Sequence, residues 1–166
     1  MLNKLCIKLQ ERVWDWNEEE LKAKFIIPLL CEVDFDSENY QSFFERTIVV
    51  DFNNETLSGN IDFLVSQGKR SPKRPFFLIN EYKKEHESSN DPLGQLLSAM
   101  IAVQKLNDDD KPVYGIYVMG RLWSFVVLHK NEYSVSLAFD ATKKEIFDIF
   151  CILKNTKNII EKMILK

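Results

Sequence analysis

The chain has 166 residues, the length of one ordinary domain, and we expect a single domain over residues 1–166. Hydrophobic residues make up 45% and charged residues 28% of the sequence, which is typical of a globular fold and argues against disorder. The 22 Lys and Arg residues stand against 25 Asp and Glu residues, giving a formal net charge of −3. This charge excludes a uniformly basic protein of the histone type, but it is compatible with a local basic patch.

The cysteines and the apolar runs indicate the cellular compartment of the protein. Cys6, Cys31 and Cys151 are far apart and match neither a disulfide framework nor a thiolate zinc site, so we expect buried thiols in a reducing compartment. No apolar run approaches the ~20 residues that cross a bilayer, and the first residues lack a signal-peptide core. We therefore predict a cytoplasmic protein without membrane contact. With only 2 histidines, its chemistry would depend on carboxylates, lysines or a carboxylate-bound metal.

The first predicted helix begins after Asn17. Asn is a residue type that caps helices, and Glu20 three positions later completes a capping box. Pro28 predicts a kink or an early end of this helix. The apolar residues that follow the cap at helical spacing are Leu21, Phe25, Ile26, Leu29 and Leu30.

Three predicted strands and a second helix follow. The strands cover residues 43–52, 57–66 and 76–83, and the last of these has an apolar core on both faces, as a central strand does. Asp91 and Pro92 then predict the start of a helix that ends near residue 106. Because a helix links the third strand to the next one, we expect those two strands to be parallel.

The rest of the chain predicts three more strands and a closing helix. The strands cover 113–119, 122–128 and 133–139. Asp140 is the expected cap of a last helix that begins near residue 142 and has a possible break near Asn155. The whole pattern predicts a mixed sheet flanked by helices.

Glu81 and Lys83 break the apolar pattern of the third strand and share one face of it. If a loop at about residues 67–75 joins the second and third strands, Asp62 lies opposite a residue near position 80, beside Glu81. A hard cation needs anionic oxygens, and a nearby ammonium group can hold an attacking water. The three side chains therefore predict a metal site at one edge of the sheet.

These residues match a known pattern. Ile61-Asp62-Phe63 followed by Ile79-Asn80-Glu81-Tyr82-Lys83-Lys84 resembles the signature of the PD-(D/E)XK nuclease superfamily, also called restriction-endonuclease-like. Over about residues 14–128 the predicted order of helix, three strands, helix and strand is also similar to that of the family. The resemblance implies an α/β fold of the mixed α+β type, with a restriction-endonuclease-like core and extra C-terminal strands and helix. Ile61 stands where the family signature has proline.

The resemblance also implies roles for individual residues. Asp62 and Glu81 would bind Mg²⁺ or Mn²⁺, and the backbone carbonyl of Tyr82 would add a ligand. Lys83 would position or polarise the water that attacks a phosphodiester. Gln95, in the first turn of the second helix, resembles the glutamine that several family members place beside the site.

Many members of this family also carry a glutamate on the first helix. At 100° per residue, the apolar face of that helix centres close to the direction of Glu18, whereas Glu19 lies at its flank and Glu20 points away. We therefore predict Glu18 as the site glutamate, with Glu19 second. An ordinary first-turn acid that favours the helix dipole is the open alternative.

A basic segment lies between the second and third strands. It carries four positive charges and no negative one, and basic loops of this kind can neutralise phosphates. A merely solvated hairpin tip is the open alternative. The candidate nucleic-acid-binding residues are Lys69, Arg70, Lys73 and Arg74.

The sequence thus predicts a metal-dependent nuclease that hydrolyses DNA, with RNA as an open alternative substrate. A chain of this length has no room for a separate specificity domain, so target choice would need a homodimer or a partner subunit. The main rival is an inactive nuclease-fold module for DNA binding or assembly. An enzyme for small phosphorylated substrates would need a glycine-rich phosphate loop, and the sequence has neither common form of it.

Overall fold

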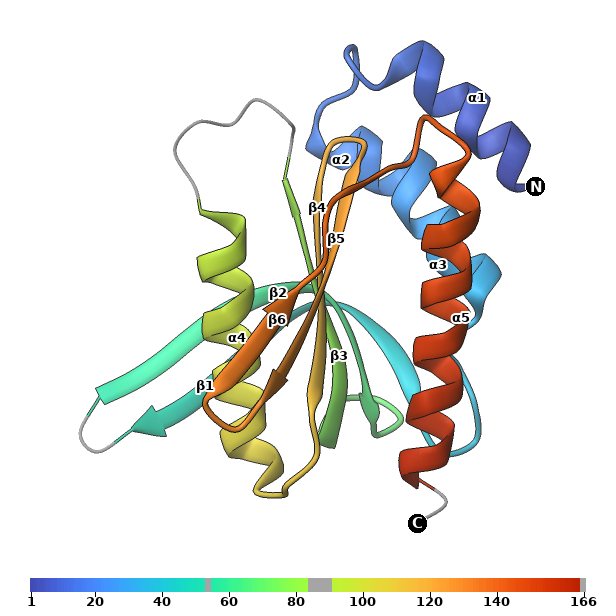
Figure 1. Cartoon of the computed structure of the whole chain (residues 1–166). Helices are drawn as coiled ribbons and strands as arrows, with labels where there is room; N and C mark the ends of the chain where they lie inside the picture. The colour runs from blue at the N-terminus through green and yellow to red at the C-terminus, as the bar shows by residue number, and fades with distance from the viewer. Residues whose placement is uncertain (53–54, 84–90, 165–166) are drawn as a thin grey trace.

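The computed structural model describes residues 1–52, 55–83 and 91–164. Within this part of the chain, the helices and strands follow the order predicted for the central region, with an additional helix at the start (Figure 1). The elements in chain order are α1 (Leu2–Arg12), α2 (Glu18–Leu21), the π-helical segment η1 (Lys22–Ile26), α3 (Ile27–Val33), β1 (Gln41–Phe52), β2 (Glu55–Gln67), β3 (Lys73–Lys83), α4 (Pro92–Asn107), β4 (Val113–Met119), β5 (Leu122–His129), β6 (Glu132–Val135), β7 (Phe139–Asp140) and α5 (Glu145–Ile164).

The described strands form one mixed sheet of seven strands. Its order is β1-β2-β3-β4-β5-β6, and β7 pairs with β5 beside this path. Only β3 and β4 are parallel, and α4 is the crossover between them, as the sequence predicted. The other pairs are antiparallel. A mixed α+β architecture is therefore confirmed.

Helices cover both faces of this sheet (Figure 1). On one face, α4 packs Leu96 and Met100 against Ile79 and Val113 in one buried cluster. Gly115 on β4 allows this close approach, because a Cβ atom there would lie 2.5 Å from Met100 Sδ. On the other face, α1, α3 and α5 cover a second and larger buried cluster that includes Leu9, Phe25, Phe63, Trp123 and Ile149.

The predicted early end of the helix at Pro28 is wrong, although the helical run has an irregular turn just before this residue. The Asn17–Glu20 capping box is present, but the helix neither ends nor breaks at Pro28 and continues to Val33. The irregularity is the π turn η1, in which the N–H of Ile27 donates to the carbonyl of Lys22. Proline has no N–H for the carbonyl of Lys24, four residues earlier, and Lys8 Nζ on α1 donates to that oxygen instead at 3.3 Å.

The C-terminal region also departs from prediction. The strand expected over 133–139 is split into β6 and β7, and α5 passes Asn155 without a break. Asp140 does not cap α5 but accepts hydrogen bonds from Thr142, within the turn before the helix.

The cysteines are not buried as expected: Cys31 and Cys151 are exposed and Cys6 is partly exposed. All three thiols are free. Of the helices in the described ranges, none is both long enough and apolar enough for a membrane crossing.

Candidate functional site

Asp62 is tied to the strand that carries the predicted signature. The backbone N–H of Tyr82 donates to Asp62 Oδ2 at 2.8 Å. The neighbouring cross-strand pair is Phe63 with Asn80, which agrees to within one residue with the register predicted from the hairpin. Asp62 and the Glu81–Lys83 segment thus meet at one end of β3.

Lys22, which the sequence patterns did not single out, occupies the centre of this site. Its ammonium group is 3.0 Å from Asp62 Oδ1, 3.3 Å from Glu18 Oε1 and 3.4 Å from Glu45 Oε1. Glu19 Oε1 lies at 3.3 Å. The residue is only 7% exposed, so these carboxylates supply the charge partners that water would otherwise provide. Its side chain also lies over the ring of Tyr82, with Nζ 5.9 Å from the centroid.

A local irregularity brings Glu45 to Lys22. The β1–β2 ladder pairs Phe44 with Phe63 and Arg46 with Ile61, and Glu45 lies between them, in register with Asp62. Glu45 has a positive φ of 50°, which is uncommon for a residue other than glycine. Such conformations cost energy and are often found at functional sites.

Glu18 connects the two lysines of the site. Its Oε1 atom is 3.3 Å from Lys22 Nζ and 4.0 Å from Lys83 Nζ, and Lys83 is in turn 3.3 Å from Glu81 Oε1. The Glu18 side chain is 26% exposed, against 81% for that of Glu19. The helical periodicity therefore ranked the inward-facing glutamate correctly.

The electrostatics of the site show an excess of negative charge. Five carboxylates, those of Glu18, Glu19, Glu45, Asp62 and Glu81, surround two ammonium groups. Burial raises the pKa of Glu81 to about 7, and the charge of Asp62 raises it too, although Lys83 lowers it.

Both ammonium groups are held in the charged form. Burial lowers the pKa of Lys22, but the carboxylates around it, first Asp62 and then Glu45 and Glu18, together outweigh burial and raise the pKa above its ordinary value. The pKa of Lys83 is also raised, because its carboxylate neighbours, first Glu81 and then Glu18, outweigh burial. Each lysine is therefore a hydrogen-bond donor to the carboxylates of this site.

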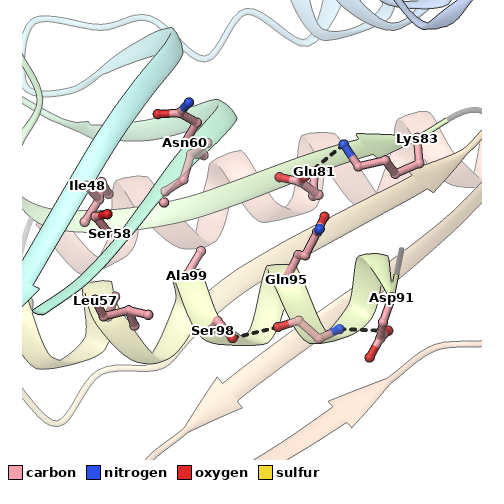
Figure 2. A pocket seen from close by; sticks show the side chains of 14 residues that line it. Ile48, Leu57, Ser58, Asn60, Glu81, Lys83, Asp91, Gln95, Ser98 and Ala99 are labelled. Carbon is pink, nitrogen blue, oxygen red and sulfur yellow. Dashed lines mark hydrogen bonds and ion pairs between the residues drawn. The ribbon is translucent and has the colours of Figure 1, made fainter. Parts of the chain in front are cut away.

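A groove of about 710 Å³ opens beside the Glu81–Lys83 pair, between α4 and the β1–β2 hairpin. Figure 2 shows the Gln95 side chain extending from α4 toward Glu81. Gln95 is thus beside the predicted site. The other groove-lining side chains are small or aliphatic for the most part, and only Glu81, Lys83 and Asp91 among the described lining residues are charged.

The donor set suits a hard divalent cation in its chemistry. Carboxylate oxygens are the ligands that Mg²⁺ and Mn²⁺ prefer, and the surplus of carboxylates would be balanced by such an ion. Burial is the main cause of the raised pKa of Glu81, and the neighbouring charge of Asp62 adds to it. Within residues 1–52, 55–83 and 91–164, however, no three carboxylate, imidazole or thiol groups converge into a ready metal centre. The ammonium group of Lys22 is the cation that the Asp62 carboxylate contacts directly.

The basic segment lies at the opposite end of β3 from the site. Lys69 and Arg70 are in the turn between β2 and β3, and Lys73 and Arg74 begin β3. All four are exposed, and Arg74 donates to the carbonyl of Leu106 at 3.2 Å. At about 3.3 Å per residue, the length of β3 separates this segment from Glu81 and Lys83 by about 30 Å.

Two site residues were not predicted from the sequence. Lys22 could have been found, because it lies four residues after Glu18 and so shares its helix face, inside an otherwise apolar run. Glu45 gave no such signal, since its position depends on the irregular β1–β2 pairing. Lys84 of the quoted signature lies outside the described residues. A search of protein-family models, curated proteins and solved structures finds no match for this chain.

Proposed function

We propose that this chain is a divalent-metal-dependent nuclease of the PD-(D/E)XK type, with DNA as its substrate and RNA as a second possibility to be tested. The observation that carries this proposal is the convergence of Glu18, Asp62, Glu81 and Lys83 at one end of the sheet. These residues come from α2, β2 and β3, and the resemblance assigns a role to each of them.

In this proposal Asp62, Glu81 and the carbonyl of Tyr82 would hold Mg²⁺ or Mn²⁺. The ion would act as a Lewis acid on the phosphate and lower the pKa of a bound water. The Lys83 ammonium, held between Glu81 and Glu18, would orient the attacking water and stabilise charge on the phosphate oxygens. Its raised pKa supports a donor role over that of a general base.

Two further features support a nucleic-acid substrate. The groove beside Glu81 and Lys83 has room for the nucleotides next to the scissile bond of a nucleic-acid strand. Gln95 lines this groove. The exposed basic segment from Lys69 to Arg74, about 30 Å away along β3, is suited to phosphates that flank the cleavage point. Target choice would come from a second copy of the chain or from a partner subunit.

One observation favours the rival function, a module that keeps this arrangement without cutting. Lys22 already neutralises Asp62 at 3.0 Å, and a buried ammonium group in that place can stabilise the site without a metal. Such a module would bind nucleic acid or a partner chain through the same surfaces.

A cleavage assay separates the two functions. Purified protein is incubated with supercoiled, linear and single-stranded DNA and with RNA, in Mg²⁺, Mn²⁺ or EDTA. The proposal predicts cleavage that requires the metal and is lost in Asp62→Asn and in Lys83→Ala. Absence of cleavage with every substrate and metal would favour the non-cutting module.

Matched variants guard against a contaminating nuclease. Asp15→Asn and Lys130→Ala change the same residue types at exposed surface positions, where Asp15 pairs with Arg12 and Lys130 with Asp110. Both variants are expected to cut like the wild type. Equal activity in Asp62→Asn, Lys83→Ala and these controls would assign the cleavage to a contaminant.

A further inference from the structure

Lys22 is a buried lysine whose ammonium group is surrounded by carboxylates. Its ammonium group has four carboxylate partners, from α2, β1 and β2, within 3.0–3.4 Å. It begins the π turn η1, a kind of distortion that is frequent at functional sites. A buried charge of this kind is retained only when its partners compensate the loss of water.

The oxygen that Lys22 contacts is the one that a metal ion would need. Asp62 Oδ2 accepts the N–H of Tyr82 at 2.8 Å, so Oδ1 is the oxygen of that carboxylate that faces a cation. Lys22 Nζ lies 3.0 Å from Asp62 Oδ1 and also contacts Glu18, whose Oε1 atom is within 4.0 Å of Lys83. An ion bound to Asp62 Oδ1 and the Lys22 ammonium group would repel each other at this distance.

We propose that Lys22 is a built-in competitor of the divalent cation, so that the ion binds Asp62 only by displacing the Lys22 ammonium group. This inference rests on the proposed function, since it assumes that the site takes a cation. It assigns to Lys22 a positioning role: in the metal-free protein the lysine holds the carboxylates together, and it lowers the affinity of the site for the metal.

The surroundings of Lys22 allow its ammonium group to move away from Asp62 and keep a charge partner. Two of its partners, Glu19 and Glu45, have side chains that are 81% and 64% exposed. The long lysine side chain can therefore keep a charge partner at the surface after it leaves Asp62. This exchange costs less than sending an unpaired ammonium group into water or leaving it beside a metal ion.

The first test is the affinity for Mn²⁺, measured by isothermal titration calorimetry on the metal-free protein. Lys22→Gln keeps a hydrogen-bond donor but removes the charge, and we expect it to bind Mn²⁺ about tenfold more tightly than the wild type, or better. Lys24→Gln is the matched control, because Lys24 lies in the same π turn and pairs with the partly exposed Glu20, away from the site. It should bind Mn²⁺ like the wild type.

The second test uses the wild-type chain and does not depend on the folding of a variant. An amine-reactive reagent is applied with Mn²⁺ or with EDTA, and the modified lysines are identified by peptide mass spectrometry. Lys22 should be protected in EDTA and become reactive in Mn²⁺, whereas the half-exposed Lys24 should react equally in both. Protection of Lys22 while Mn²⁺ is bound would overturn the inference.

The outcomes separate this inference from the function on which it rests. Equal Mn²⁺ affinity of the wild type and Lys22→Gln would contradict the competitor role and leave the metal site intact. Loss of Mn²⁺ binding in Lys22→Gln would instead make Lys22 a support of the site. If neither protein binds Mn²⁺ or Mg²⁺, the proposed metal-dependent function fails, and the competitor role fails with it.

Discussion

Lys22 Nζ lies 3.0 Å from Asp62 Oδ1, and this contact joins two residues that are 40 positions apart in the chain. This ion pair links the start of the π turn to the strand that carries the first acidic residue of the predicted signature. Both groups are largely buried, and removal of Lys22 would leave Asp62 and the neighbouring carboxylates without a compensating charge, which costs more than the pair itself contributes. Under the proposed function, the stability and the chemistry of the site would depend on the same ion pair.

Replacement of Asp62 should show this dependence. Asp62→Ala removes the nearest of the four carboxylates around Lys22 and the acceptor of the Tyr82 N–H, and we expect a loss of about 1–3 kcal/mol in the free energy of unfolding. Asp62→Asn retains an acceptor for Tyr82 and should lose less. The measurement is urea unfolding in EDTA. Asp15→Ala, at a position 67% exposed, should change stability by less than about 1 kcal/mol, and an equal loss there would refute the argument.

Glu81 should give the fold a pH dependence. Its pKa is raised from 4.5 to about 7 in the folded chain, so between these values the folded state holds a proton that the unfolded state has lost. Stability should then fall as the pH rises from 4.5 to 7, by about 3 kcal/mol, and stay level above that window.

Urea unfolding in EDTA across this pH range measures the effect. Glu81→Gln should remove this part of the pH dependence, whereas Glu132→Gln, on the exposed β6 strand, should keep it. A wild-type stability that rises between pH 4.5 and 7 more steeply than that of Glu81→Gln would contradict the raised pKa.

The basic segment should act through phosphates. Simultaneous replacement of Lys69, Arg70 and Lys73 by serine should weaken DNA binding. The slope of log affinity against log salt should decrease by about 0.9 for each phosphate that the variant no longer neutralises. Arg74 is kept because it donates to the carbonyl of Leu106. Fluorescence anisotropy in EDTA measures the affinity without cleavage.

A matched triple variant tests whether DNA binding depends on the position of the basic segment or only on the net charge of the protein. Lys4, Lys130 and Lys144 are also exposed and lie in α1, after β5 and before α5. Their replacement by serine changes the net charge equally but should leave the salt slope nearer to that of the wild type. Equal slopes for the two triple variants would mean that the basic segment does not bind phosphates specifically.

Lys8 and Pro28 should be energetically coupled. Lys8 donates a hydrogen bond to the Lys24 carbonyl, because Pro28 has no N–H to donate to it. Lys8→Met should therefore lower the free energy of unfolding by about 1 kcal/mol. In a Pro28→Ala background a backbone N–H becomes available, and the same change should cost less. A double-mutant cycle by urea unfolding measures the difference, and additive effects would show that the two residues are independent.

Local patterns in the sequence were sufficient for most of the central fold. The capping box at Asn17, the helix start at Asp91 and the β2–β3 register depend on neighbouring residues or on a short loop, and all three are confirmed. The parallel β3–β4 pair followed from the crossover helix. Glu18 was found because helical periodicity alone decides which residues face inward.

The features that were missed depend on residues distant in sequence. Helix α1 carries many charged and polar residues, and it buries little more than Leu5 and Leu9, against a surface that α5 helps to form. The hydrogen bond to the Lys24 carbonyl, for which Pro28 has no N–H, comes from Lys8, which lies on α1. The positive φ of Glu45 and its ion pair with Lys22 require the β1–β2 pairing to be in place. No local pattern contains this information.

The rate of cleavage by Lys83→Met, compared with that of the wild type at saturating Mn²⁺, tests the central claim most directly. Lys83 contacts Glu81 and Glu18 but is not a proposed ligand of the ion, so the variant should still bind Mn²⁺. We predict that the wild type cuts DNA and that the variant cuts at least ~100-fold more slowly, in keeping with the loss of one group that stabilises the transition state. Equal cleavage rates, or no cleavage by a wild-type protein that has bound Mn²⁺, would contradict the proposed function.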